Sequence, residues 1–131
     1  MKISVDTNVL ARALLQDDVE QARDAAKILE EATLIAVSLP CLCELAWILM
    51  RGAQFPKEKV AVAIRALLDA DNVVMNRPAV EAGLAILAAG GDFADGVIAY
   101  EGQWLGGETF VSFDKKAVEL IAAQGQAVRL L

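Results

Sequence analysis

The chain has 131 residues, of which 56% are hydrophobic and 23% are charged. This length suits a single domain with a real core, and the composition is not that of a disordered protein, so we expect residues 1–131 to form one domain. The longest apolar stretch, residues 34–50, contains Ser38, Pro40 and Glu44 and is too short and too polar for a membrane span. The N-terminal residues lack the apolar segment of a signal peptide, which favours a cytoplasmic protein.

The charge and the missing histidine narrow the possible functions. With 12 basic and 18 acidic residues the net charge is −6, which argues against a non-specific nucleic-acid binder unless acids gather around cations. The chain has no histidine, which excludes Ser–His and Cys–His nucleophiles and makes a zinc site improbable. Cys41 and Cys43 are too close in sequence for a structural disulfide, and we expect buried free thiols. Any enzymatic chemistry therefore falls to carboxylates and a hard metal ion.

Hydrophobic spacing and the Gly, Pro and Asp punctuation predict an alternation of strands and helices. The first half reads as a strand over 2–5, helices over 7–16 and 19–32, a strand over 34–37, a helix over 40–50 and a helix over 56–70. The second half reads as a strand over 73–75, helices from 78 to Gly90 and over 94–105, a strand over 109–112, a helix over 115–124 and a strand over 127–130. Short apolar strands alternating with helices predict an α/β fold with a parallel sheet covered on both faces.

Two aspartates each follow a predicted strand and precede a helix. Asp6 ends the first strand, and Asp114 ends the strand over 109–112. Each has an alternative interpretation as a helix N-cap, which we rate as about equally good. The carboxyl ends of parallel strands meet at one edge of a sheet, where such folds place their sites, so both carboxylates are expected at the same rim.

Glu44 is an acid within a predicted helix whose other residues are almost all apolar. We expect it to be buried, where an unpaired carboxylate is costly and needs a partner. The alternative is pairing with a distant arginine or lysine. A bound cation shared with other acids is the simpler explanation. Trp47, on the same helix, is expected in the core.

Asp92 and Asp95 open the helix over 94–105. Asp92 is a candidate N-cap, and an acid in the first turn is favoured by the helix dipole. We expect Asp95 to face the site, with Asp92 as a weaker candidate that orients it or contacts a water on the metal. Asp17 and Asp18 are more simply explained as capping the second helix.

Four motifs, DTNVL, ELAW, GDFADGVIA and TFVSFD, resemble those of PIN-domain proteins in order and spacing, and are most similar to VapC-type toxins of bacterial toxin–antitoxin pairs. The resemblance implies a three-layer α/β/α sandwich with a central, mostly parallel sheet. It also implies one or two Mg²⁺ or Mn²⁺ ions and hydrolysis of phosphodiester bonds in RNA. The catalytic and metal-binding acids that match are Asp6, Glu44, Asp95 and Asp114. Asn8 and Ser112 match the supporting polar positions, and residues 100–108 depart from the usual pattern.

Substrate and partner contacts are less firmly marked. Arg12, Lys115 and Lys116 are candidates for phosphate contacts, although Arg12 has an acidic neighbour as an alternative and the lysines can be ordinary solvated residues. Trp104 is a candidate for stacking on a base, with local packing as the commoner role. The resemblance implies a homodimer and a small antitoxin that blocks the site, and the apolar face of residues 60–68 is compatible with a dimer contact.

Two other functions remain open from the sequence. A phosphoaspartyl receiver or phosphatase also uses aspartates at strand ends, but Asp6 is followed by Thr7 and Asn8 rather than by a second aspartate two residues on. A PIN-like binding module with a degenerate site is the non-enzymatic alternative, against which the four retained acids argue.

Overall fold

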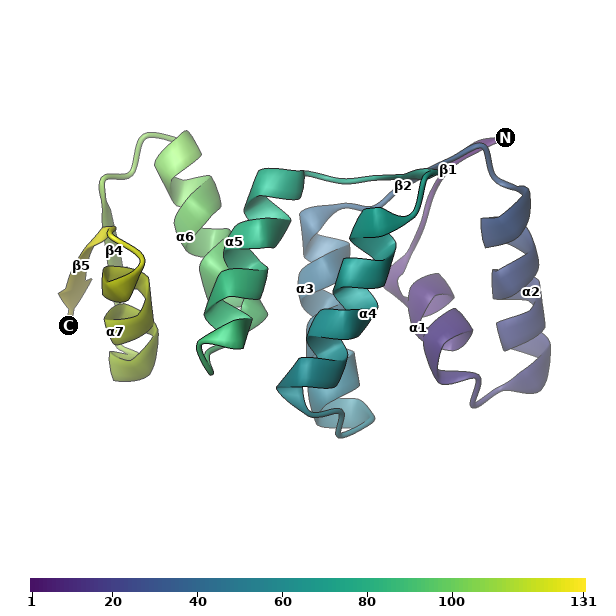
Figure 1. Cartoon of the computed structure of the whole chain (residues 1–131), viewed down its shortest axis with the longest axis horizontal. Coiled ribbons are helices and arrows are strands. Elements are labelled where there is room, and N and C mark those ends of the chain that lie inside the picture. Colours follow the sequence, from purple (N-terminus) through teal and green to yellow (C-terminus); the bar gives the residue numbers. More distant parts are fainter. The chain divides into compact units, whose positions relative to one another are not determined.

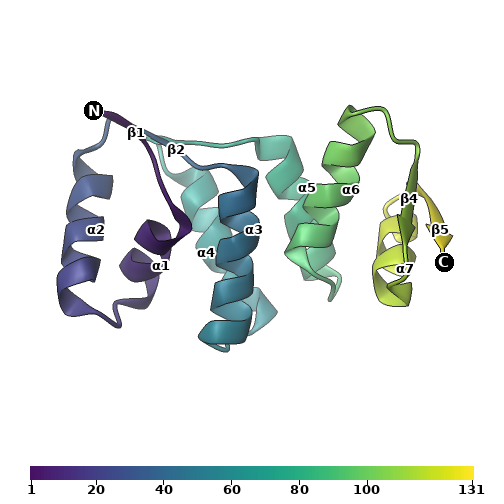
Figure 2. The same ribbon diagram turned by 180° about the vertical axis from the view of Figure 1, so that it is seen from behind.

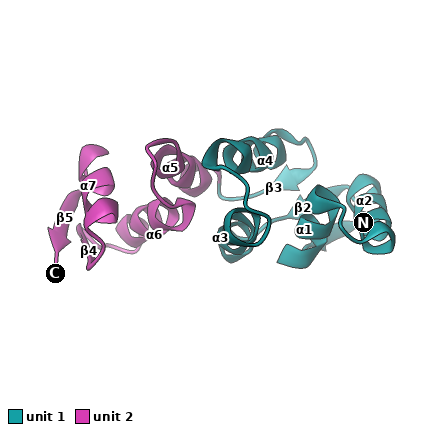
Figure 3. Cartoon of the chain, turned by 90° about the horizontal axis from the view of Figure 1, so that it is seen from below, with its two compact units in different colours: residues 1–76 teal, residues 77–131 magenta.

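A computed structural model describes all residues, 1–131, and shows two compact units, residues 1–76 and 77–131 (Figure 3). In chain order the elements are β1 (Lys2–Ser4), α1 (Thr7–Leu15), α2 (Val19–Glu31), β2 (Leu34–Ala36), α3 (Leu39–Trp47), η1 (Ile48–Gly52), α4 (Lys57–Asp69), β3 (Val73–Val74), α5 (Arg77–Ala88), α6 (Phe93–Trp104), β4 (Thr109–Ser112), α7 (Lys115–Ala123) and β5 (Ala127–Leu130) (Figure 1). The first unit ends with β3, and the second begins with α5.

The first unit contains a three-stranded parallel sheet in the order β1–β2–β3. Ile35 of the central strand is in register with Ile3 of β1 and Val73 of β3. The pair of helices α1 and α2 pack against each other, and α1 also packs against α3. The parallel pairing predicted from the alternation of strands and helices is therefore present in this unit.

The turn between α1 and α2 is held by polar contacts. Asp18 caps α2 by accepting a hydrogen bond from the backbone N–H of Gln21 at 3.1 Å, as expected for an aspartate before a helix. The guanidinium of Arg12 lies 3.2 Å from Asp17 and donates from Nε to the Gln21 side chain at 2.8 Å. Arg12 thus contacts an acidic neighbour, the alternative to a phosphate contact that the sequence analysis left open. Its hydrogen bond to Gln21 connects α1 to α2.

Helix α3 is less buried than its composition predicts. Ser38 caps it by accepting from the N–H of Cys41 at 3.3 Å, and its buried residues are Cys41, Leu42, Leu45 and Ala46. Glu44 and Trp47, three residues apart on the other side of the helix, are exposed, Trp47 to 64%. The expectations that Glu44 is buried and Trp47 lies in the core were wrong, because uniform apolar composition conceals which face of a helix is covered.

The apolar face of α4 contributes to the core of the chain. Val60 and Ile64 are 0% exposed and Leu68 is 2% exposed. Helix α4 packs on α3 and β3. These three side chains are therefore not available for the dimer contact with which the sequence was compatible.

In the second unit, α5 and α6 lie side by side in both ribbon views (Figures 1 and 2). Glycine makes this approach possible, since a Cβ added at Gly96 would lie 2.5 Å from the carbonyl oxygen of Ala82. Strands β4 and β5 pair in parallel, with Phe110 opposite Val128. Ile86, Ala99 and Ile121 form a buried cluster against which Phe110, Leu120 and Val128 pack.

The α/β class and the parallel strand pairing are confirmed. The strands over 109–112 and 127–130 have the predicted bounds. The largest shift is in α3, which ends at Trp47 rather than Met50 and continues as the π-helical segment η1 to Gly52. None of the helices is both long enough and apolar enough to cross a membrane.

Candidate metal centre

Asp6 and Glu44 both belong to the first unit and lie near one buried thiol. Asp6 is the N-cap of α1 and accepts a hydrogen bond from the backbone N–H of Asn8 at 3.4 Å. Glu44 is carried by α3. The pKa of the Cys41 thiol is raised by burial, while a hydrogen bond from Thr7 lowers it and the charges of Asp6 and Glu44 raise it further. The charges of both carboxylates therefore reach Cys41, which lies on α3, the helix that packs against α1.

Glu44 has no cationic partner within its own unit. Arg12 of α1, a candidate partner, pairs instead with Asp17 in the turn after α1. The alternative in which an arginine or lysine of this unit neutralises Glu44 therefore has no support. An exposed carboxylate pays little for its charge in water, so the exposure of Glu44 also removes the need for a partner that burial would have imposed.

Asp95 and Asp114 belong to the second unit, where they interact with Asp92. The pKa of Asp95 is raised, first by burial and then by the negative charges of Asp92 and Asp114. Like charges disfavour ionisation because each carboxylate is repelled by the others. Asp92 at the start of α6 and Asp114 after β4 therefore both lie close enough to Asp95 to disfavour its charged form.

Local hydrogen bonds fix Asp114 more firmly than Asp92. Asp114 caps α7 by accepting from the N–H of Ala117 at 3.0 Å, and its own backbone N–H donates to the Ser112 hydroxyl at 2.9 Å. Asp92 occupies the N-cap position of α6, yet its side chain makes no capping hydrogen bond. Asp6 and Asp114 therefore cap their helices through their side chains. Asp92 stands at the N-cap position, but its side chain does not cap the helix.

The residues predicted to contact substrate differ in whether other side chains of the protein already bind them. Lys115 and Lys116 are exposed in the first turn of α7, directly after Asp114. The Arg12 guanidinium is occupied by Asp17 and Gln21. Trp104 is 75% exposed and its indole N–H donates to the Tyr100 hydroxyl at 2.8 Å, so local packing does not cover its ring.

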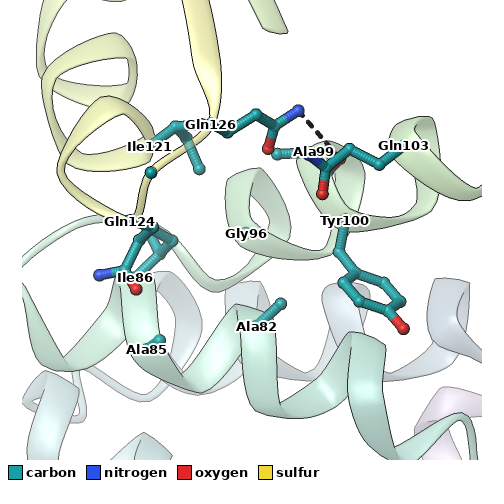
Figure 4. A pocket seen from close by; sticks show the side chains of 11 residues that line it. Ala82, Ala85, Ile86, Gly96, Ala99, Tyr100, Gln103, Ile121, Gln124 and Gln126 are labelled. Atoms are coloured by element: carbon teal, nitrogen blue, oxygen red, sulfur yellow. Dashed lines mark hydrogen bonds between the residues drawn. The ribbon is translucent and has the colours of Figure 1, made fainter. Parts of the chain in front are cut away.

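Each unit also has a cavity that contains none of the four predicted ligands. A cavity of about 240 Å³ in the second unit is lined by small apolar residues, Tyr100 and three glutamines, and the amide of Gln126 donates to the Ala99 carbonyl at 3.5 Å (Figure 4). Its lining has no charged side chain. A cavity of about 450 Å³ between α1 and α2 is lined in part by Asn8, Arg12 and Asp24. Neither cavity offers the carboxylate cluster that a hard cation needs.

Comparison with known protein families assigns the chain. The model of the PIN domain matches residues 3–122, which include most of both units and all four predicted acids. The chain belongs to the PIN-domain family. No curated protein and no solved structure gives a significant match. PIN domains are a nuclease-type family that acts on nucleic acid, and the match gives no support to a phosphoaspartyl receiver.

The donor set of this PIN domain fits a divalent metal in chemistry. PIN domains typically use divalent metals. All four predicted ligands are carboxylates, the oxygen donors that Mg²⁺ and Mn²⁺ prefer, and the chain has no histidine to favour a softer ion. Neither unit by itself contains a group of three or more acidic or cysteine side chains arranged to hold a metal. Two of the four predicted acids, Asp6 and Glu44, belong to the first unit, and the other two, Asp95 and Asp114, belong to the second.

Sequence reasoning missed Thr7 and Cys41 as neighbours of the acids. Thr7 is 5% exposed and is the one polar side chain in the buried core. Two sequence signals for these neighbours were available. Thr7 directly follows Asp6 in DTNVL, and Cys41 precedes Glu44 by three residues. Residues three apart lie near each other on a helix, which was a signal for Cys41 beside Glu44, but nothing local connects Cys41 to Thr7.

Proposed function

We propose that this PIN domain is a metal-dependent endoribonuclease in which Asp6, Glu44, Asp95 and Asp114 together hold one or two Mg²⁺ or Mn²⁺ ions. The observation that carries the proposal is the gathering of acids around Asp95 in the second unit, where burial and then the charges of Asp92 and Asp114 raise the pKa of Asp95. A concentration of carboxylates of this kind is relieved by a bound cation. The family match, which includes all four acids in one span, supports assigning them to one site in a single domain.

The residues take different roles in this proposal. Asp6, Glu44, Asp95 and Asp114 are the ligands, and the Ser112 hydroxyl fixes Asp114 through its backbone N–H. When bound, the cation supplies Lewis acidity and positive charge next to the scissile phosphate. Asn8 and Asp92 are proposed to position water, and the absence of a capping bond from the Asp92 carboxylate supports this role for Asp92.

Lys115 and Lys116 are proposed to contact phosphate oxygens of the RNA. They directly follow Asp114 and are exposed. Arg12 is a weaker candidate because it would first have to release Asp17 and Gln21. A lysine ammonium attracts phosphate as a point charge and compensates in part for the acidic surroundings.

The finer biological role rests on the motif resemblance. We propose a cytoplasmic toxin of a VapBC-type pair that forms a homodimer and is blocked by a cognate antitoxin. The alternative is a PIN-like module that binds RNA without cleaving it. Cleavage assays separate the two, because a binding module retains RNA and leaves it intact.

The decisive experiment compares two N-capping aspartates of the first unit, Asp6 and Asp18. Asparagine caps a helix about as well as aspartate, so Asp6→Asn and Asp18→Asn both leave their caps in place. Only Asp6 is a proposed ligand. Purified protein should cleave single-stranded RNA with Mg²⁺ or Mn²⁺, stop on addition of EDTA, lose activity in Asp6→Asn and keep it in Asp18→Asn.

Two results would overturn the proposal. Cleavage that survives EDTA would show that no divalent metal is needed. Equal activity of Asp6→Asn and the wild type would show that the acids are not the site.

A further inference from the structure

We propose that the uncharged cavity of the second unit binds one base of the RNA substrate, an adenine. The inference rests on the proposed function, since it names the part of the RNA that this cavity holds. The cavity has a volume of about 240 Å³ and is lined by residues of α5, α6, α7 and the turn that leads from α7 to β5 (Figure 4). None of the proposed metal ligands lines it.

The cavity is open because the helices that border it carry small residues. Ala82 and Ala85 of α5 line it together with Gly96 and Ala99 of α6. Ile86, which belongs to the buried cluster, adds a larger apolar side chain to the lining. A cavity of about 150 Å³ is enough to hold benzene, so this larger one has room for the fused rings of a purine. Its size and apolar walls thus fit a flat, uncharged ring system.

Three glutamine amides supply the polar part of the lining. Gln103 comes from α6, and Gln124 and Gln126 come from the turn after α7. The Gln126 amide nitrogen donates to the Ala99 carbonyl at 3.5 Å, which leaves its carbonyl oxygen and its second N–H for a ligand. The side-chain amides of Gln103 and Gln124 have no hydrogen-bonding partner in the protein. The cavity therefore offers both donors and acceptors, and no charge.

This lining selects adenine among the four bases. A glutamine amide has a donor and an acceptor side by side and pairs with the N6 and N7 atoms of adenine, an edge that single-stranded RNA leaves free. Guanine is instead favoured by arginine or lysine, and cytosine by acidic side chains, none of which lines the cavity. Uracil lacks the methyl group through which apolar side chains recognise thymine.

An aromatic pair on α6 adds a stacking surface beside the amides. Tyr100 lines the cavity, and its hydroxyl accepts a hydrogen bond from the Trp104 indole N–H at 2.8 Å. This bond restrains the orientation of the Tyr100 ring. Bases of single-stranded RNA stack on aromatic rings whatever the sequence, so Tyr100 adds affinity while the amides add selectivity.

The helix that carries this lining also carries a proposed metal ligand. Asp95 lies in the first turn of α6, and the cavity begins at the next residue, Gly96. At 1.5 Å per residue, Gln103 lies about 12 Å from Asp95 along the helix axis. A base held in the cavity therefore belongs to a nucleotide near the scissile phosphate.

The test follows the binding of adenosine to the full chain by NMR, without divalent metal. Adenosine carries the base but no phosphate, so the proposed metal site plays no part in its binding. We expect saturable shifts of the backbone amide signals of Gly96, Gly125 and Gln126, and none with ribose, which lacks the base. No shift with adenosine, or shifts confined to residues outside the cavity, would overturn the inference.

Two matched pairs of variants separate base recognition from loss of the fold. Tyr100→Leu should weaken adenosine binding about tenfold, whereas Tyr100→Phe, which keeps the ring, should remain within about twofold of the wild type. Gln103 is exposed, and Gln103→Glu keeps the size of the side chain but removes the amide donor, so it should also weaken binding about tenfold. Gln54→Glu makes the same chemical change at an exposed position of the first unit and should leave binding unchanged. Equal affinities of the four variants would overturn the inference.

The outcomes distinguish this inference from the proposed function. Adenosine binding at the cavity without RNA cleavage overturns the nuclease and leaves the base site supported. RNA cleavage whose KM is the same in Gln103→Glu and in the wild type overturns the base site and leaves the nuclease intact. Absence of both adenosine binding and RNA cleavage overturns both.

Discussion

Each unit contains two of the four predicted acids, but the side chains that neighbour these acids differ between the units. In the first unit, burial and the charges of Asp6 and Glu44 raise the pKa of the Cys41 thiol. In the second unit, Asp95 and Asp114 are joined by a third carboxylate, Asp92, and the pKa of Asp95 is raised. The acids of the first unit therefore lie near a thiol, whereas Asp95 of the second unit lies near two further carboxylates. The second unit has more to gain from a cation.

The largest expected effect tests whether the two units serve one site. Asp6→Asn and Asp95→Asn, one from each unit, should each lower RNA cleavage by about a thousandfold or more, and the double variant should lose little beyond either single one. Residues that act as a unit show this non-additivity, because the first loss already disables the site. Single-turnover rates of the four proteins measure it. If the loss of cleavage rate in the double variant equals the product of the two single losses, the two units act independently.

The next effect concerns how helices pack in the second unit, which contains every glycine except Gly52. Gly96→Ala should lower the free energy of unfolding by about 1–3 kcal/mol, since its Cβ would meet the backbone of α5. Gly102→Ala, on the same helix with nothing within 4 Å of the added Cβ, should raise it by about 0.5–1 kcal/mol. Urea unfolding measures both, and equal effects would contradict the close approach of α5 and α6.

A matched core pair tests the prediction of one domain. Ile64 and Ile86 are 0% and 1% exposed and belong to different units. Ile64→Val and Ile86→Val should each cost about 1 kcal/mol. If residues 1–131 unfold as one domain, each variant shifts the same single transition in calorimetry. Two transitions, each shifted by one variant only, would show that the units unfold separately.

The smallest expected effect is the pH dependence of stability. The pKa of Asp95 is raised in the folded protein, so the folded state binds more protons than the unfolded state. Its contribution to stability is therefore present below the ordinary aspartate pKa and is lost as the pH rises through the raised value. Without divalent metal, Asp95→Asn should gain stability relative to the wild type between about pH 4 and neutrality. Parallel urea midpoints across that range would contradict this.

The elements themselves were largely predictable because their signals are local. Ser38, Asp18 and Asp114 cap the helices that follow them, and the strands over 109–112 and 127–130 have the predicted bounds. A cap depends on atoms within about three residues, and helical periodicity depends on neighbours three and four apart. The four proposed ligands were likewise chosen from motifs that each occupy a short stretch, and their role as ligands stays a prediction.

The environment of those acids was not predictable in the same way. Glu44 was expected to be buried and is exposed, because an apolar helix does not reveal which face its neighbours cover. Arg12 was a candidate for RNA and is engaged by Asp17 and Gln21. Both outcomes depend on how separate helices pack.

The sequence by itself determined the α/β class, the order of the elements and the acids that match the PIN-domain motifs, because each depends on short-range pattern. Only the tertiary structure decided that Asp92 and Asp114 act on Asp95, and that Thr7, Asp6 and Glu44 act on Cys41. Charges and hydrogen bonds act through space, so contacts between segments far apart in the chain arise only when helices and strands pack.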